Sequence, residues 1–157
     1  MVIYSVHPKK RELFRGTVLV MDIINIIGID IDKNGRIWTS DGTTIYSVNP
    51  YYIVMRLKDY LVKHNISVIC IEDKDTSDMS FRRTNNKLIA VNNIIVGKLR
   101  NYTIVKVPAY HTSDTCSSCG YSNKVNRRSK TLFYCGQCNI RTHADKNAAI
   151  NIRNRGL

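Results

Sequence analysis

The sequence predicts a mixed α/β domain that carries a metal-binding insertion and ends in a helix. Two observations lead to this fold class. Apolar stretches typical of strands alternate with segments of helical periodicity along most of the chain. Four of the five cysteines form two CxxC pairs towards the C-terminal end. With 157 residues, 43% of them hydrophobic, the chain can form one domain with an apolar core and a small appended module.

The first elements predicted are three strands in a meander, followed by a helix. A strand is expected over about residues 25–32, and the turn at 33–35 follows it. Two shorter strands, RIWTS and TTIYSV, are separated by a turn at Asp41 and Gly42. Pro50 then starts an amphipathic helix. Its predicted apolar face consists of Ile53, Leu57, Tyr60 and Leu61.

Two further strands and two further helices complete the prediction. ISVICIED is a buried strand, in which the fifth cysteine, Cys70, is expected to be a core residue. TIVKVPAY is another strand that leads into the cysteine-rich segment, and ADKNAAINI begins the last helix. Between the two strands lies a helix predicted from the spacing of Phe81, Leu88, Val91, Ile95 and Leu99.

The two CxxC pairs predict a structural zinc site. Cys116 and Cys119 form the first pair, Cys135 and Cys138 the second, and fifteen residues separate them. Each pair can turn two thiolates towards one point, and two pairs complete a tetrahedron of sulfurs. Disulfides are the alternative, but no secretory segment is found. Because four thiolates leave no open coordination position, this zinc is expected to stabilise the fold and not to perform chemistry.

The charge distribution favours a polyanionic partner, most simply a nucleic acid. The formal net charge is +12, and residues 112–157 hold half of this excess. A merely solvated basic surface is the alternative. The longest apolar run is interrupted by acids and shorter than a membrane span, so we expect a soluble, intracellular protein without a transmembrane segment.

Basic residues crowd the segment between the cysteine pairs and recur in the last helix. A metal-pinned basic hairpin tip is well placed to contact phosphates, although a merely soluble loop is the alternative. Of the two aromatic residues beside it, Phe133 and Tyr134, one is expected to pack under the zinc site. The candidate nucleic-acid-binding residues are Lys124, Arg127, Arg128, Lys130, Arg153 and Arg155.

Two acids end apolar strands. Asp30 shares a strand face with Gly28 and Asp32, and the isoleucines between them point to the opposite face. Glu72 ends the later strand on the face of Cys70. Because a buried carboxylate is costly, each acid is expected to lie at the strand's end or to bind a cation.

A third acid, Asp145, lies in the first turn of the last helix, for which Thr142 is the predicted N-cap. Ala149 and Ile152 follow on the same face, and the small alanines let this helix approach the sheet closely. Taken alone, Asp145 is interpreted as an acid that complements the helix dipole. Taken with the two strand-end acids, it suggests a shared divalent-metal site.

In order along the chain, these segments resemble the RuvC-like nuclease and zinc-ribbon portion of TnpB (OrfB) proteins, to which type V CRISPR effectors are similar. The resemblance covers the chain from about residue 25 to its end and is most specific over residues 110–155. The matching segments are GIDI with Asp30, IED with Glu72, YHTSDTCSSCGY, YCGQC, and ADKNAAINI with Asp145.

The resemblance implies an RNase H-like (RuvC-like) fold, in which a mixed sheet has flanking helices and an inserted four-cysteine zinc ribbon. It also implies that Asp30, Glu72 and Asp145 are catalytic and bind two Mg²⁺ or Mn²⁺ ions for phosphodiester hydrolysis. Metal-activated water needs no histidine base, so His111 and His143 are expected to be structural or surface residues.

The sequence departs from the family pattern at two positions near the acids. Asp32 stands where the family usually has glycine, and Lys74 stands where an apolar residue is common. The expected domains are a nuclease domain at residues 25–111 and 141–157, a zinc ribbon at 112–140, and an unassigned N-terminal segment at 1–24.

The leading functional hypothesis is a Mg²⁺- or Mn²⁺-dependent endonuclease that acts on branched or single-stranded DNA. It would be close in size to a free-standing RuvC-type Holliday junction resolvase, which would act as a homodimer. DNA is the expected partner and RNA the alternative. Two further hypotheses remain: a catalytically weak or inactive nucleic-acid-binding module, and the nuclease subunit of a split RNA-guided effector.

Overall fold

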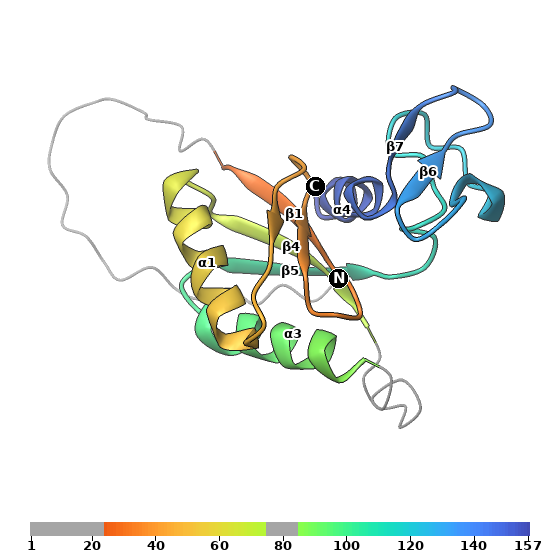
Figure 1. Cartoon of the computed structure of the whole chain (residues 1–157). Coiled ribbons are helices and arrows are strands. Elements are labelled where there is room, and N and C mark those ends of the chain that lie inside the picture. The colour runs from red at the N-terminus through yellow and green to blue at the C-terminus, as the bar shows by residue number, and fades with distance from the viewer. Residues whose placement is uncertain (1–23, 75–84) are drawn as a thin grey trace, which may run out of the picture.

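The computed structural model describes residues 24–74 and 85–157. Its largest unit is a mixed five-stranded sheet with the order β3-β2-β1-β4-β5 (Figure 1). Strands β1, β4 and β5 run parallel, whereas β2 is antiparallel to both β1 and β3. The predicted mixed α/β class is therefore confirmed. The strands are β1 (Ile26–Ile31), β2 (Ile37–Thr39), β3 (Thr44–Ile45), β4 (Val68–Asp73) and β5 (Thr103–Pro108).

Helices cover both faces of the sheet (Figure 1). Helices α1 (Pro50–Lys63) and α3 (Asn86–Lys98) lie on one face, and α4 (Ala144–Arg155) lies on the other. Ile27, Ile29 and Ile31 of β1 point into the layer under α1 and α3, where they are part of the main apolar core. Among the described residues, no helix is both long and apolar enough to cross a membrane.

Helix α1 begins where the sequence predicts. The Asn49 side chain caps it by accepting a hydrogen bond of 2.9 Å from the backbone N–H of Tyr51, and Pro50 occupies the first turn. The predicted apolar face packs into the core, with Tyr60 only partly buried. The fully buried residues of the predicted face are Ile53, Leu57 and Leu61.

Helix α4 lies unusually close to strand β1, as the alanines predict. A Cβ atom added to Gly28 would lie 2.1 Å from the carbonyl oxygen of Ala149 and 2.5 Å from the backbone nitrogen of Arg153. Only glycine therefore permits this contact. On the same face of the sheet, Cys70 is fully buried against Ile152, which confirms its role as a core residue.

Two predicted details are wrong, and a third lies outside the described residues. The N-cap of α4 is His143 and not Thr142, because the Nδ1 atom of His143 accepts a hydrogen bond of 3.2 Å from the backbone N–H of Asp145. The third strand contains only two residues. The described part of the second predicted helix begins at Asn86, and Phe81 lies outside the described residues, as do residues 1–23.

The segment between β5 and α4 forms a separate small unit beside the N-terminal end of α4 (Figure 1). It contains the 3₁₀ turn η1 (Lys124–Asn126) and a two-stranded antiparallel sheet of β6 (Leu132–Tyr134) and β7 (Arg141–His143). We call residues 112–143 the ribbon. Phe133 is fully buried against Cys116 and Cys135, which confirms that one aromatic residue packs under the cysteines.

Candidate active site

The structure brings the three predicted acids to one cavity of about 800 Å³. Asp30 comes from β1 and Glu72 from the adjacent parallel strand β4, each two residues beyond the paired residues Gly28 and Cys70. Because side chains alternate along a strand, both acids face the side of the sheet that α4 covers. Asp145 enters the same cavity from the first turn of α4.

Glu72 is held by two neighbours. The hydroxyl of the buried residue Thr112 donates a hydrogen bond to Oε1, and the Nζ atom of Lys74 lies 2.7 Å from Oε2. Burial alone would lower the pKa of Lys74, but the charges of Glu72 and Asp30 raise it. The carboxylate of Glu72 is thus fixed in position and paired with a buried positive charge.

Asp30 is the most perturbed acid of the site. Its side chain is 12% exposed, and its Oδ1 atom lies 3.8 Å from Nζ of Lys74. Burial raises the pKa of Asp30, Lys74 lowers it, and the nearby charges of Glu72 and Asp145 raise it again, to about 7. Within the described residues no hydrogen-bond donor reaches this carboxylate. A further cation would therefore stabilise its charged form.

Asp145 pairs with a residue of the ribbon. The guanidinium of Arg127 donates a hydrogen bond of 2.8 Å to Oδ1 of Asp145, whose side chain is 13% exposed. Arg127 also donates to the carbonyl oxygen of Lys130, at 3.3 Å. Arg127 therefore places a positive charge inside the cavity, where the sequence had suggested an exposed phosphate contact.

The donor set fits a hard divalent cation. Carboxylate oxygens are preferred ligands of Mg²⁺, and the three acids would supply ligands from the sheet and from helix α4. In the part of the chain that the structure describes, the oxygens of the three acids do not all lie within 4.8 Å of one another. Lys74 and Arg127 are instead their direct ionic partners.

The four cysteines form a group that is able to hold a structural zinc ion. Their Sγ atoms all lie within 4.8 Å of one another, and the thiols are free. Sulfurs of Cys116 and Cys138, and of Cys119 and Cys135, are 3.6 Å apart. A tetrahedral site with Zn–S bonds of about 2.3 Å needs sulfurs roughly 3.8 Å apart, so the arrangement fits zinc. The predicted site is thus assembled in space.

Backbone N–H groups contribute to favouring the thiolate form of one cysteine, Cys135. Burial alone would raise the pKa of the Cys135 thiol, but the N–H groups of Gln137 and Cys138 lower it to about 6. Since a thiolate is the form that binds metal, this geometry prepares Cys135 as a ligand.

Three other residues near the acids have structural roles. Oδ1 of Asp32 accepts hydrogen bonds from the backbone N–H groups of Asn34 and Arg36, at 2.8 and 2.9 Å, so this fourth acid forms the turn after β1. His143 caps α4 and stacks on Trp38, with ring centroids 4.0 Å apart. Both rings line the cavity.

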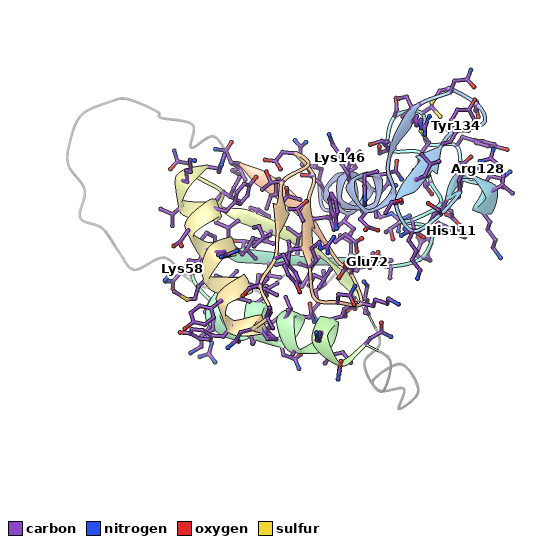
Figure 2. The ribbon with its side chains drawn as sticks, viewed as in Figure 1. Lys58, Glu72, His111, Arg128, Tyr134 and Lys146 are labelled. Carbon is purple, nitrogen blue, oxygen red and sulfur yellow. The ribbon has the colours of Figure 1, made fainter. Side chains whose placement is uncertain are left out.

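Of the remaining basic candidates, Lys130 lines the cavity with the acids, whereas Lys124, Arg128, Arg153 and Arg155 are not among its lining residues. Figure 2 shows Arg128 on the ribbon near Tyr134, whereas Glu72 lies at the sheet. The guanidinium of Arg128 lies 5.6 Å from the centre of the Tyr134 ring. Arg155 donates to the carbonyl oxygens of Pro108 and Tyr110, at 2.7 and 2.5 Å. The exposed basic candidates are Lys124, Arg128, Lys130 and Arg153.

Sequence reasoning missed the residues that hold the site together. Buried Asn151 donates to the carbonyl oxygens of Thr112 and Thr115, at 2.8 and 2.7 Å. Asn147 donates to Thr115 and accepts from the backbone N–H of Ser117. These amides fasten the start of the ribbon to α4. Their only sequence signal is that two asparagines, four residues apart, occur in an alanine-rich helix.

Part of the chain is similar to known proteins. Residues 91–152 match the family described as Cas12f1-like, TNB domain. A CRISPR-associated endodeoxyribonuclease Cas12f1 from an uncultured archaeon is 32% identical over 116 residues, covering 64% of this chain and 22% of the relative. A protein of the same name from Syntrophomonas palmitatica is 31% identical over 104 residues, covering 62% of this chain and 20% of the relative.

Solved structures show the same relationship. A Cas12f1 in complex with sgRNA and target DNA has a TM-score of 0.55 and 27% identity over 69% of this chain and 33% of that chain. The mini-RNA-guided endonuclease CRISPR-Cas_phi3 shares the fold, with a TM-score of 0.53 and 22% identity. The match covers 68% of this chain and 18% of that chain.

The chain is therefore related to the TnpB and type V effector proteins. Its resemblance to a Cas12f1-like TNB domain is carried by residues 91–152, which include the four cysteines and Asp145. The chain spans about a fifth of the length of the curated relatives that it matches.

Proposed function

We propose that this chain is a Mg²⁺- or Mn²⁺-dependent endonuclease that hydrolyses phosphodiester bonds in DNA. The observation that carries the proposal is the convergence of Asp30, Glu72 and Asp145 on one cavity beside two positively charged side chains. Acids of this kind, separated along the chain and gathered in a cavity, are typical of metal-dependent phosphoryl transfer.

In this proposal the sheet and the helices that flank it form an RNase H-like domain, whose parts are residues 25–111 and 141–157. Residues 112–140, the larger part of the ribbon, form the insertion that zinc would stabilise through the four cysteines. The mixed sheet and the likeness to the Cas12f1 complex support this division.

The acids would hold divalent metal, which would supply Lewis-acid activation of the attacking water and of the phosphate. Thr112 orients the carboxylate of Glu72 through its hydroxyl. The guanidinium of Arg127 is half-buried at the cavity and can bind a phosphate oxygen of the substrate. Trp38 and His143 line the wall of the same cavity.

Nucleic acid is the proposed partner. The relatives are named endodeoxyribonucleases, and one solved relative is a complex with sgRNA and target DNA. In this chain the exposed basic residues of the ribbon, Lys124, Arg128 and Lys130, would contact the phosphate backbone near the cavity. Single-stranded or branched DNA is the proposed substrate, and action on a four-way junction would require a homodimer.

Cleavage assays with Mn²⁺ test this proposal on single-stranded DNA, duplex DNA, four-way junctions and RNA. We expect Mn²⁺-dependent cutting of DNA that falls at least about a hundredfold in Glu72→Gln and in Asp145→Asn, since each removes a proposed metal ligand. The matched control is Asp59→Asn, which makes the same charge change on the exposed side of α1 and leaves cutting unchanged. Absence of Mn²⁺-dependent cutting on every substrate contradicts the proposal.

A second function is a binding module that does not cut. The ionic pairs of Lys74 and Arg127 with the three acids favour it, because they satisfy the carboxylates without a metal. This alternative predicts strongly salt-dependent DNA binding that is insensitive to Mn²⁺ and to the substitutions of Glu72 and Asp145.

A further inference from the structure

The ammonium group of Lys74 lies among the oxygen atoms that a metal ion would bind in the acidic site. It follows β4 directly, and its Nζ atom contacts three oxygen atoms from two neighbouring strands. These oxygens are Oε2 of Glu72 at 2.7 Å, the carbonyl oxygen of Ile31 at 3.4 Å, and Oδ1 of Asp30 at 3.8 Å.

An ammonium group in this position competes with a metal ion for the same ligands. It binds one oxygen of Glu72 and lies beside Oδ1 of Asp30, which are two of the three proposed ligand groups. Because Lys74 belongs to the chain, its local concentration at the site is fixed and does not depend on dissolved metal. A divalent ion must therefore share these oxygens with a tethered positive charge or displace it.

The charges of the cavity show how many ions can be accommodated. Three ionised carboxylates carry three negative charges, and Lys74 with Arg127 carries two positive charges. The other charged residues that line the cavity, Asp32, Asp73, Lys33, Arg36 and Lys130, add one net positive charge, so one divalent ion leaves an excess of two positive charges and two divalent ions leave four. In a half-buried cavity such an excess is strongly unfavourable.

We propose that Lys74 is a built-in cation that occupies one of the two cation positions of the Asp30, Glu72 and Asp145 site, so that the site takes one divalent ion. This inference rests on the proposed function and names the residue that sets its metal stoichiometry. Lys74 is a positioning residue, because it acts on the acids and through them on the ion.

The number of bound Mn²⁺ ions per chain tests the inference directly. It can be counted from the loss of the electron paramagnetic resonance signal of free Mn²⁺ during titration of the full chain. We expect one ion in the wild type, two in Lys74→Met, and one in Lys74→Arg, which restores the charge. We also expect the first ion to bind at least about tenfold more tightly in Lys74→Met, because a nearby positive charge is removed.

Lys106→Met is the matched control. Lys106 lies 3.4 Å from the exposed acid Asp73, and its β5 position is in register with Ile71, whose side chain packs in the core under α1 and α3. Lys106 thus occupies the sheet face opposite to Glu72. The substitution removes the same charge from a neighbouring strand, and we expect it to leave the count at one.

The outcomes separate this inference from the proposed function. Two ions in both the wild type and Lys74→Met would overturn the role of Lys74 while leaving a metal-dependent site intact. No bound Mn²⁺ in any variant would overturn both.

If Lys74→Met unfolds without metal because two acids lose their partner, thermal unfolding monitored by circular dichroism provides a second test. Stabilisation of that variant by Mn²⁺ well beyond that of Lys106→Met supports the inference, and equal stabilisation overturns it.

Discussion

Asp30 shows how the surroundings of a single residue define the site. A carboxyl group on an exposed strand end would be ionised at neutral pH, but burial beside two other acids raises the pKa of Asp30 to about 7. Lys74 compensates only part of this cost, at 3.8 Å. A cation bound at this position would therefore favour the ionised form of Asp30, as expected of a metal ligand.

A different acid, Asp41, links the first hairpin to α1 and gives a pH-dependent contribution to stability. Burial raises its pKa, but hydrogen bonds from the hydroxyls of Thr39 and Tyr60 and from the backbone N–H of Thr43 lower it to about 2. Since the pKa of Asp41 in the folded protein lies below the ordinary value of 3.8, the contribution is complete above about pH 4 and is lost as the pH falls towards 2.

We therefore predict that Asp41→Asn lowers the free energy of unfolding by about 1 kcal/mol at pH 7, a value reduced for solvent screening of this exposed residue. Urea unfolding of both proteins at pH 7, 4 and 2.5 measures the difference, which should shrink only between pH 4 and 2.5. In a Tyr60→Phe background, which lacks one donor, the substitution should cost less. A difference that is constant across this range would show that Asp41 does not act through its charge.

At the scale of elements, the close contact between β1 and α4 connects the fold to the site. Gly28 and Asp30 share one face of β1, and the same helix that packs on Gly28 carries Asp145. The distance between two of the acids is thus set by a glycine that lets two backbones approach. Small residues in the motif GIDI and in the last helix therefore determine the geometry of the acidic cavity as well as the packing.

We predict that Gly28→Ala lowers the free energy of unfolding by about 1–3 kcal/mol, because the added methyl group would meet backbone atoms that cannot move independently. Urea denaturation measures this loss. Gly97→Ala is the matched control, since a Cβ atom there has no neighbour within 4 Å and the site is exposed in helix α3. It should stabilise the protein by about 0.5–1 kcal/mol. Equal effects at the two glycines would contradict the packing argument.

Most elements could be predicted because local patterns determine them. The apolar run around Ile29 and the face of Ile53 and Leu57 have the periods of a buried strand and an amphipathic helix, and both formed as expected. The cap of α4 could not be predicted, because both Thr142 and His143 can accept the first backbone hydrogen bond. Strand β3 is shorter than its β-branched residues suggest, since the chain soon turns towards Asn49, the cap of α1.

At the scale of the whole molecule, the ribbon contributes directly to the cavity at the sheet. Arg127 lies between the cysteine pairs in sequence, yet it hydrogen-bonds Asp145 at the start of α4. Asn147 and Asn151 fasten the other end of the ribbon to the same helix. The acidic cavity is therefore fully assembled only when the ribbon is folded against helix α4.

The site could be predicted only in part, because tertiary packing brings residues of the ribbon to the cavity. Each of the three acids ends or begins an apolar element, which is a local signal for Asp30, Glu72 and Asp145. The ionic partners Lys74 and Arg127 are set by tertiary packing, and no periodicity in the sequence pairs Arg127 with an acid eighteen positions later. Lys74 was visible only as a departure from the TnpB pattern.

The central claim is that the three acids jointly bind a divalent ion. Anomalous diffraction at the manganese edge, from crystals of the full chain soaked in Mn²⁺, tests it most directly. The account predicts an anomalous peak in the cavity within about 2.5 Å of carboxylate oxygens from at least two of Asp30, Glu72 and Asp145. Crystals in which manganese binds elsewhere, while Lys74 and Arg127 remain paired with these acids, would contradict it.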